Sequence, residues 1–143
     1  MLTKLALDSK AVWGYSPEFM AACRAELTVD ETKLSDTRFQ YWVSEDKQEI
    51  LGFYALEKQS DTTFELEALF VTPGSIGKGV GRALLEHAKA QAASEGATTL
   101  TIQGDPNAEK FYRAAGAQRV GELESASIPG RFLPLFELRI EGN

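Results

Sequence analysis

A glycine-rich turn is the segment of this sequence whose residue types are best suited to chemistry. Residues 76–82 read Ile-Gly-Lys-Gly-Val-Gly-Arg and lie between an expected strand and an expected helix. Amides that point inward at the start of a helix, with the helix dipole behind them, bind anions such as phosphate. We therefore expect an anion site formed by Gly77, Lys78, Gly79, Val80, Gly81 and Arg82. A turn that only reverses the chain is the alternative.

Two common phosphate motifs do not fit this turn. A P-loop has a Gly separated by four residues from the Gly-Lys pair and a Ser or Thr after it, whereas Thr72 and Gly79 occupy those places. A dinucleotide fingerprint needs a small third residue, where Arg82 or Leu84 falls in this sequence. Both mismatches disfavour a nucleotide-phosphate enzyme.

A second segment follows the next expected strand, at residues 105–117. Together the two segments resemble those of the GNAT-type N-acetyltransferases, which transfer an acetyl group from acetyl-CoA to an amine. That family has a Gln/Arg-x-x-Gly-x-Gly/Ala turn and, after the following strand, a helix that opens with Asn-x-x-Ala-x-x-aromatic-or-Leu-Tyr. The matching residues are Gly79 and Gly81 in the turn, and Ala108, Phe111, Tyr112 and Gly116 in the helix. The resemblance covers about residues 52–140.

The resemblance implies an acetyl-CoA site and a mixed sheet. Besides the glycine turn, the implied cofactor-binding residues are Leu69, Phe70, Val71, Asp105, Asn107 and Phe111. The backbone of residues 69–71 is implied to bind the pantetheine arm and to polarise the thioester carbonyl. The sequence departs from the family at Ile76, where Gln or Arg is common, and at Asp105, where Asn is usual, so that one pantetheine contact is expected to pass to Asn107. The family's usual first strand is also missing from the pattern.

Acetyl transfer to an amine needs a base, hydrogen-bond donors for the carbonyl oxygen and a proton for the departing thiolate. Tyr112 is the candidate acid, because a phenol can hydrogen-bond the sulfur and the matching family position often does so. A packing role is the alternative for this residue. Glu67 is the candidate base, acting directly or through water, and is preferred to Glu65 because it lies nearer the thioester end. A solvated strand end is the alternative for both glutamates.

Three residues are candidates for binding the acceptor. Trp13 and Tyr15 lie between two expected helices that, in the family, cover the acceptor cleft, so their rings either bind an apolar acceptor or pack the helix pair. Arg131 can bind an acceptor carboxylate, with a solvated loop side chain as its alternative. His87 is expected to have a structural or exposed position, and Cys23 a core role. One histidine and one cysteine exclude a His-rich site and a cysteine cluster, so we expect no metal.

Hydrophobic periodicity and turn residues predict the elements that must position these groups. Helices are expected over about 2–13, 17–27, 80–95 and 106–116, with a short helical turn after Asp30. Strands are expected over about 39–43, 50–56, 64–71, 98–103, 117–123 and 132–140. Alternation would place Glu65, Glu67, Leu69 and Val71 on one face of their strand and Leu66, Ala68 and Phe70 on the other. We predict one α/β domain over 1–143, with a mostly antiparallel sheet, a parallel crossover and helices on both faces.

The charge balance narrows the class of partner. The net charge is −6, and the surplus lies in residues 1–67, which hold 7 basic and 13 acidic side chains. A chain this acidic does not suit nucleic acid or anionic lipid. Because the acidic part is expected to meet the acceptor, the balance mildly favours a cationic amine. Neither a targeting segment nor a membrane span is visible, so we expect a cytoplasmic protein.

These observations favour one function over two others. The leading hypothesis is an acetyl-CoA-dependent N-acetyltransferase in which a small-molecule or peptide amine attacks the thioester directly, without an acetyl-enzyme. A catalytically silent acyl-CoA sensor of the same fold is the second, and the nucleotide-phosphate enzyme is the third. An open sheet edge makes a homodimer a further expectation.

Overall fold

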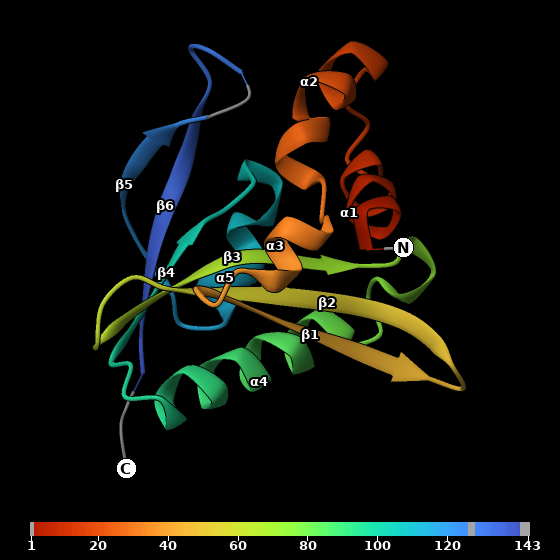
Figure 1. Ribbon diagram of the computed structural model, residues 1–143. Coiled ribbons are helices and arrows are strands. Elements are labelled where there is room, and N and C mark those ends of the chain that lie inside the picture. The colour runs from red at the N-terminus through yellow and green to blue at the C-terminus, as the bar shows by residue number, and fades with distance from the viewer. Residues whose placement is uncertain (1, 126–127, 141–143) are drawn as a thin grey trace.

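A computed structural model describes residues 2–125 and 128–140, and in these residues a sheet of six strands forms the centre of the fold. The strands are β1 (Phe39–Asp46), β2 (Glu49–Lys58), β3 (Thr63–Val71), β4 (Thr99–Gln103), β5 (Gln118–Glu124) and β6 (Phe132–Arg139). They lie in the order β1-β2-β3-β4-β6-β5 (Figure 1). The β3–β4 pair is parallel and the other pairs are antiparallel. The predicted mixed sheet with a parallel crossover is therefore confirmed.

The helices occur where the sequence predicts them. They are α1 (Leu2–Ala11), α2 (Pro17–Leu27), α3 (Glu31–Ser35), α4 (Val80–Ser94) and α5 (Glu109–Ala114), with single 3-10 turns η1 (Pro73–Ser75) and η2 (Pro106–Ala108). The Ser16 hydroxyl caps α2 by accepting from the Phe19 N–H, and the Asp30 carboxylate caps α3 in the same way. The expected 106–116 helix differs in opening with η2 and in ending at Ala114.

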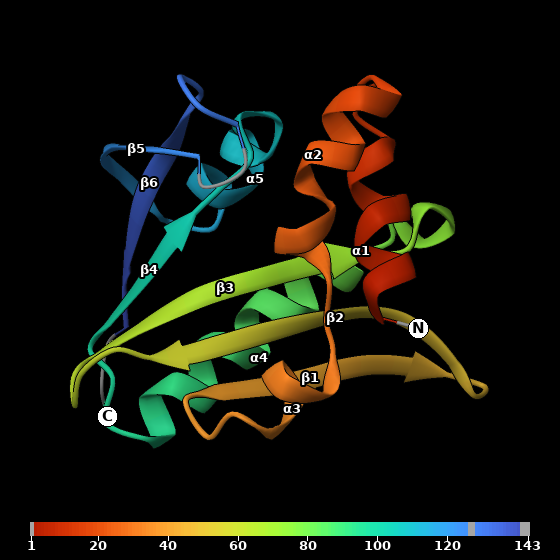
Figure 2. The same ribbon diagram turned by 45° about the horizontal axis from the view of Figure 1, so that its top comes forward.

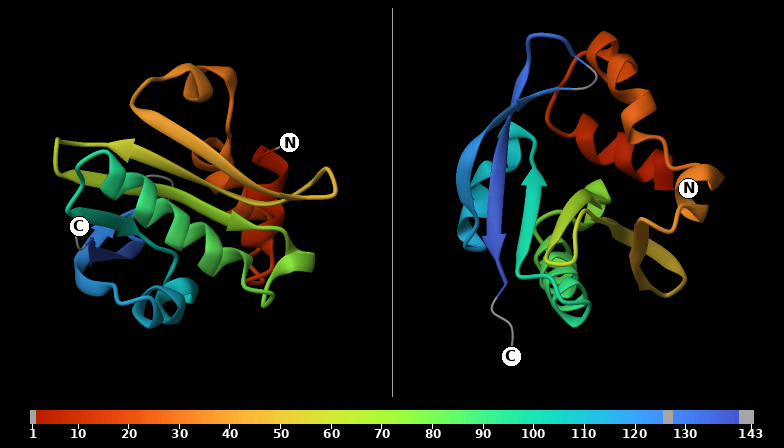
Figure 3. Two further views of the ribbon diagram at one scale, coloured as in Figure 1. Left: turned by 90° about the horizontal axis from the view of Figure 1, so that it is seen from below. Right: turned by 60° about the vertical axis from the view of Figure 1, so that its left-hand side comes forward.

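Helices cover both faces of the sheet (Figure 3). On one face, α4 and α5 pack on a core that includes Leu85, Ala88 and Tyr112. On the other face, α1 and α2 bury a smaller cluster that includes Leu5 and Cys23, and Cys23 is only 2% exposed. The predicted core role of Cys23 is thereby confirmed.

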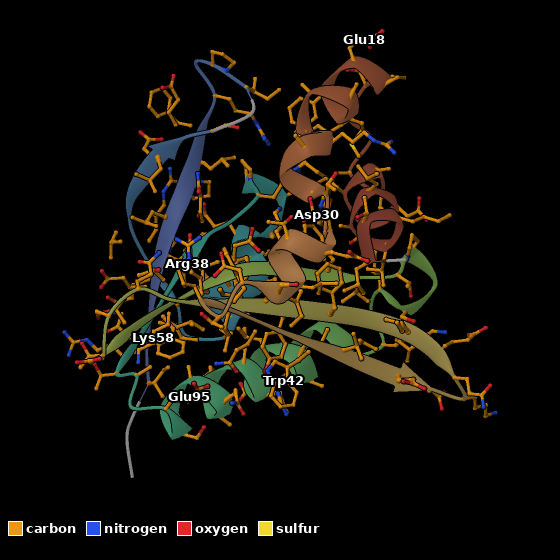
Figure 4. The ribbon with its side chains drawn as sticks, viewed as in Figure 1. Glu18, Asp30, Arg38, Trp42, Lys58 and Glu95 are labelled. Carbon is orange, nitrogen blue, oxygen red and sulfur yellow. The ribbon has the colours of Figure 1, made fainter. Side chains whose placement is uncertain are left out.

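The single histidine also has a structural setting. His87 on α4 shares a 2.7 Å hydrogen bond between its Nδ1 and the Tyr54 hydroxyl. Its ring centroid lies 4.9 Å from that of Trp42, which reaches α4 from β1 (Figure 4). His87 therefore ties α4 to the strands β1 and β2, as the structural assignment predicts.

The two parallel strands separate soon after they meet. β3 and β4 pair only from Thr63–Thr99 to Glu65–Thr101. Beyond these pairs β4 continues with β6, while β3 continues with β2, and the gap between β3 and β4 widens toward their carboxyl ends (Figure 2). This divergence opens the middle of the sheet at the level of Glu67.

A β-bulge lies at the same level. In the β2–β3 register, Leu56 pairs with Leu66 and Ala55 pairs with Ala68, so Glu67 is an extra residue on β3. A bulge of one residue shifts the alternation of side chains between the two faces of a strand.

The bulge makes the predicted alternation along this strand wrong. Leu66, Leu69 and Val71 all pack against the core beneath α4, whereas Ala68 and Phe70 pack against the cluster beneath α1 and α2. Strict alternation had placed Leu66 with Ala68 and Phe70. The physical reason is the extra residue at Glu67, which moves every later side chain to the opposite face.

We expect Gly52→Ala to destabilise the protein. A Cβ at Gly52 would lie 2.8 Å from the Phe70 carbonyl oxygen and 2.9 Å from Leu84 Cδ1, so β3 or α4 would have to move. Crowding of this kind costs about 1–3 kcal/mol of unfolding free energy, which urea denaturation measures.

Gly74→Ala is the matched control for this substitution. A Cβ at Gly74 would meet nothing within 4 Å, so its unfolding free energy should stay within about 0.5 kcal/mol of wild type. Equal stability of the two variants would contradict the close packing of β2 against β3 and α4.

Candidate active site

A pocket of about 570 Å³ occupies the gap between β3 and β4. One end is formed by the turn before α4, and the other by α1, the α2–α3 segment and Arg131. Of the predicted site residues, its lining includes Trp13, Glu67, Leu69, Phe70, Val71, Gly77, Gly79, Gly81, Arg82, Asp105, Asn107, Phe111, Tyr112 and Arg131. The predicted residues outside this lining are Tyr15, Lys78 and Val80. The fold thus brings most of the predicted site to one cavity.

The turn before α4 has the geometry of an anion cradle. Gly77 and Gly79 have φ values of 82° and 83°, a left-handed conformation that favours glycine. The first hydrogen bond of α4 runs from the Ala83 N–H to the Gly79 carbonyl at 3.0 Å. The N–H groups of residues 80–82 therefore precede the helical ladder and are available to an anion.

The predicted side chains of this turn differ in position. Arg82 lines the pocket, whereas Lys78 is exposed outside it. The Val80 side chain packs against the core. Val80 can therefore contribute only its backbone N–H to the anion cradle. Backbone amides and one arginine are therefore the groups that this turn presents.

Tyr112 lies at the centre of the pocket wall. Its ring packs between Phe111 and Phe136 at centroid distances of 5.2 and 5.6 Å, and only 7% of the residue is exposed. Within residues 2–125 and 128–140, its hydroxyl makes no hydrogen bond, so it can donate to a ligand. Burial raises the pKa of the phenol, and the negative charge of Asp105 raises it further. Tyr112 is consequently protonated at neutral pH, as an acid must be.

The bulge residue Glu67 lines the pocket beside Tyr41 of β1. Burial raises the pKa of Tyr41 to about 12, and the charge of Glu67 contributes to this shift. In the part of the chain that the structure describes, the Tyr41 hydroxyl is the buried side-chain polar group that lacks a hydrogen bond. Glu65 lies outside the lining, opposite Glu57 in the β2–β3 register. The geometry therefore separates the two candidate bases and places Glu67 at the pocket.

A polar network joins segments that are far apart in the sequence, and we call it the Asp105 network. The Tyr15 hydroxyl donates to both carboxylate oxygens of Asp105 at 2.9 Å, and Lys10 Nζ donates to one of them at 3.1 Å. Asn107 donates to Asp105 and to the Tyr15 oxygen, to which Arg131 Nη2 also donates at 2.9 Å. Burial alone would raise the pKa of Asp105, but the Asn107 N–H, the Lys10 charge and the hydrogen bonds from Tyr15 and Lys10 together lower it below its usual value.

Stacked rings and cations hold this network against the helices. The Tyr15 and Phe19 rings are parallel within 17° at 4.2 Å, and the Arg131 guanidinium lies 4.7 Å from the Phe19 centroid. The α1–α2 pair is thereby fastened to the carboxyl end of β4 and to the loop before β6. Tyr15 is thus a residue of the wall behind the cavity, whereas Trp13 lines the cavity and is 47% exposed.

Among the pocket residues that sequence reasoning missed, Lys10 and Tyr41 bear most on the chemistry of the site. Lys10 carries no local signal, since its partner Asp105 is 95 positions away. The sequence indicates only weakly that Tyr41 faces the interior, because alternation along the strand places it on the same face as Phe39 and Val43.

Comparisons with known proteins agree on one family. Residues 6–117 match the model of the acetyltransferase (GNAT) family. The peptidyl-lysine N-acetyltransferase YjaB of Salmonella typhimurium is 34% identical over 120 residues, which cover 82% of this chain and 75% of YjaB. The Escherichia coli YjaB is 32% identical over 102 residues, which cover 71% of this chain and 64% of that protein.

A solved structure shares the fold. The PaiA N-acetyltransferase of Thermoplasma acidophilum in complex with coenzyme A has a TM-score of 0.74 at 18% identity, covering 96% of this chain and 90% of PaiA. Within the described residues, no helix is both long and apolar enough to cross a membrane.

We expect Glu65→Gln to stabilise the protein at alkaline pH. Burial, with the hydrogen bond and charge of Glu57, raises the pKa of Glu65 from 4.5 to about 7. Because the folded-state pKa is the higher one, the stabilising effect of the bound proton is complete below about pH 4.5 and is lost as the pH rises through 7. At pH 8 the variant should be more stable by on the order of 1 kcal/mol, after allowance for solvent screening.

Thermal unfolding at pH 5 and pH 8 measures this difference, which should nearly vanish at pH 5. Glu45→Gln, at an exposed position of β1, is the control and should show no change with pH. An equal effect of Glu65→Gln at both pH values would contradict the proposed titration.

Proposed function

Because the chain belongs to the acetyltransferase (GNAT) family and is an acetyl-CoA-dependent N-acetyltransferase, we propose that a primary amine of a small molecule or peptide attacks the thioester directly in the pocket between β3 and β4. The single observation that carries this assignment is the position of Tyr112 in the lining of a cavity that also contains the amide cradle of α4. The proposed acid and the proposed phosphate site thus lie in the same pocket.

The pocket suits acetyl-CoA along its length. The N–H groups at the start of α4, together with Arg82, would bind the phosphates. The backbone of residues 69–71 would bind the pantetheine arm, because β3 has left β4 at this level and its groups on that side have no strand partner. Phe111 and Asn107 would line the same path. When bound, acetyl-CoA supplies the acetyl group as an activated thioester.

Three groups of the chain would carry the chemistry. Glu67 accepts a proton from the ammonium group of the acceptor, directly or through a water molecule, and so makes the nitrogen nucleophilic. A backbone N–H of residues 69–71 donates to the carbonyl oxygen as negative charge develops on it. As the carbon–nitrogen bond forms, the nitrogen releases a second proton to solvent. As the carbon–sulfur bond breaks, Tyr112 gives its proton to the departing sulfur. The proton held by Glu67 later returns to Tyr112 through solvent.

The acceptor class follows in part from the relatives. Both YjaB proteins are peptidyl-lysine N-acetyltransferases by name, and a lysine side chain presents the primary amine that this mechanism needs. Protein lysines are therefore one acceptor class for this chain, and small amines with the same reactive group are the other.

We expect Tyr112→Phe to lower kcat about a hundredfold, the contribution typical of a positioned general acid, without changing the KM for acetyl-CoA more than about twofold. Thiol release from acetyl-CoA, measured over a panel of amines, tests both the activity and this role. Tyr54→Phe is the control, because it removes a hydroxyl that bonds His87 outside the main pocket.

Three results would decide against parts of this proposal. Unchanged turnover of Tyr112→Phe would remove Tyr112 from the acid role. Binding of acetyl-CoA without turnover of any amine would favour a silent acyl-CoA sensor. Absence of acetyl-CoA binding would contradict both assignments.

We expect Glu67→Gln to lower kcat/KM about a hundredfold at neutral pH, because an amide cannot accept the proton of the ammonium group. The loss should shrink as the pH is raised toward the pKa of the amine, where a neutral amine is available without a base. Glu65→Gln is the control, since Glu65 lies outside the pocket, and its activity should match wild type. A loss shared equally by both variants would contradict the choice of Glu67.

A further inference from the structure

The Asp105 network carries more positive than negative charge, although the protein as a whole has a net charge of −6. The charged residues that line the whole pocket are Lys10, Lys33, Arg82, Arg131, Glu67 and Asp105. In the Asp105 network, two of these cations share one carboxylate. The side chains of Lys10, Arg131 and Asp105 are only 14%, 19% and 14% exposed.

Of the two cations, Lys10 is neutralised by the Asp105 carboxylate, whereas the charge of Arg131 is not balanced within the network. The pKa of Asp105 is lowered, so its carboxylate is ionised and carries a single negative charge. Its closer cation is Lys10, at 3.1 Å, whereas Arg131 Nη2 lies 3.7 Å away, beyond good hydrogen-bond distance. A largely buried charge is costly unless it is paired. The network therefore has room for one more anion beside Arg131.

The guanidinium of Arg131 is held in an orientation that suits a carboxylate. Its face lies over the Phe19 ring, and one N–H donor of Nη2 is used by the Tyr15 hydroxyl. A guanidinium has five N–H donors. Its two-donor edges are formed by Nε with Nη2 and by Nη1 with Nη2. In the described part of the chain, Nε and Nη1 make no hydrogen bond and Nη2 uses one of its two N–H groups, so one edge with two parallel N–H groups stays open. Such an edge binds a carboxylate through two hydrogen bonds.

This anion site lies close to the proposed reaction centre. Asp105 directly follows Gly104, where a Cβ would lie 3.1 Å from the Tyr112 ring. The charge of Asp105 also acts on the Tyr112 phenol. The phosphates of coenzyme A are assigned to the other end of the pocket, so the ligand of Arg131 has to be a group of the acceptor. A small molecule that holds a carboxylate close to its amine could reach both Arg131 and the reaction centre.

We propose that the acceptor is a small amino carboxylate, such as a free amino acid, whose carboxylate binds Arg131 while its amine points toward Glu67 and Tyr112. This inference rests on the proposed N-acetyltransferase function. It excludes a lysine within a peptide as the preferred acceptor, because the carboxyl group of such a residue is an uncharged amide. The apolar residues Val12, Trp13 and Leu133, which line the same pocket, are available to its side chain.

Matched acceptors test this proposal. Thiol release is measured for glycine against glycinamide, for L-phenylalanine against L-phenylalaninamide, and for a lysine peptide with blocked ends. Wild type should prefer each acid to its amide by at least about tenfold in kcat/KM, mainly through the KM of the acceptor, since hydrogen bonds to a charged group contribute this much.

Arg131→Gln should abolish that preference by lowering kcat/KM for the acids, while kcat/KM for the amides and the KM for acetyl-CoA change less than about threefold. Arg131→Lys should restore only part of the preference. It keeps the positive charge but cannot form two parallel hydrogen bonds to one carboxylate. Arg119→Gln is the control, since Arg119 of β5 pairs with Glu109 of α5 and Glu122 of β5 outside the pocket, and it should keep the wild-type preference.

The outcomes separate this inference from the function on which it rests. If amines are acetylated but acids and amides react equally, or if the blocked lysine peptide is the best acceptor, the amino carboxylate assignment is wrong and the function stands. An equal loss for acids and amides in Arg131→Gln would show that Arg131 only fastens the helices. If no amine is acetylated, the proposed function itself fails. If Arg131→Gln does not fold, the comparison of acids with amides on the wild-type protein still tests the amino carboxylate assignment.

Discussion

The separation of β3 from β4 is the constraint on which the rest of the site depends. A parallel ladder would normally satisfy the backbone groups along the facing edges of both strands. Here the ladder ends at Glu65–Thr101, and the edges beyond it face a cavity. Each strand is held open from its other side, β3 by β2 as far as Gly52–Val71 and β4 by β6 as far as Gln103–Leu135. The fold therefore exposes unpaired backbone to a ligand without loosening either strand.

The bulge at Glu67 links this opening to the chemistry. An extra residue in β3 bends the strand at the level where it leaves β4, and it brings a carboxylate to the pocket. Beyond the bulge the alternation is reversed, so Leu69 and Val71 pack beneath α4 and anchor the segment whose backbone faces the gap. One local irregularity thus sets both the position of the proposed base and the rigidity of the proposed thioester site.

Local patterns were sufficient for the elements and for bringing the glycine turn and the Tyr112 helix to one pocket. Glycine spacing predicted a turn with free amides before α4, and the segment after β4 predicted the helix that carries Tyr112. The bulge was not predictable in this way. It depends on how β3 pairs with β2, and the sequence of β3 alone does not specify that pairing. The Lys10–Asp105 pair was missed for a related reason: its two residues meet only when α1 folds over the end of β4.

The Asp105 network joins the acceptor side of the pocket to the acid side. Asp105 replaces the Asn that is usual in the family, and an amide at this position would neither pair with Lys10 nor act on the Tyr112 phenol by its charge. On the proposed binding mode, an acceptor carboxylate takes the open edge of Arg131 and leaves Lys10 with Asp105. Asp105 then stays ionised, and its charge continues to raise the pKa of Tyr112. Binding of the acceptor is therefore compatible with a protonated acid, because different cations of the network balance the two carboxylates.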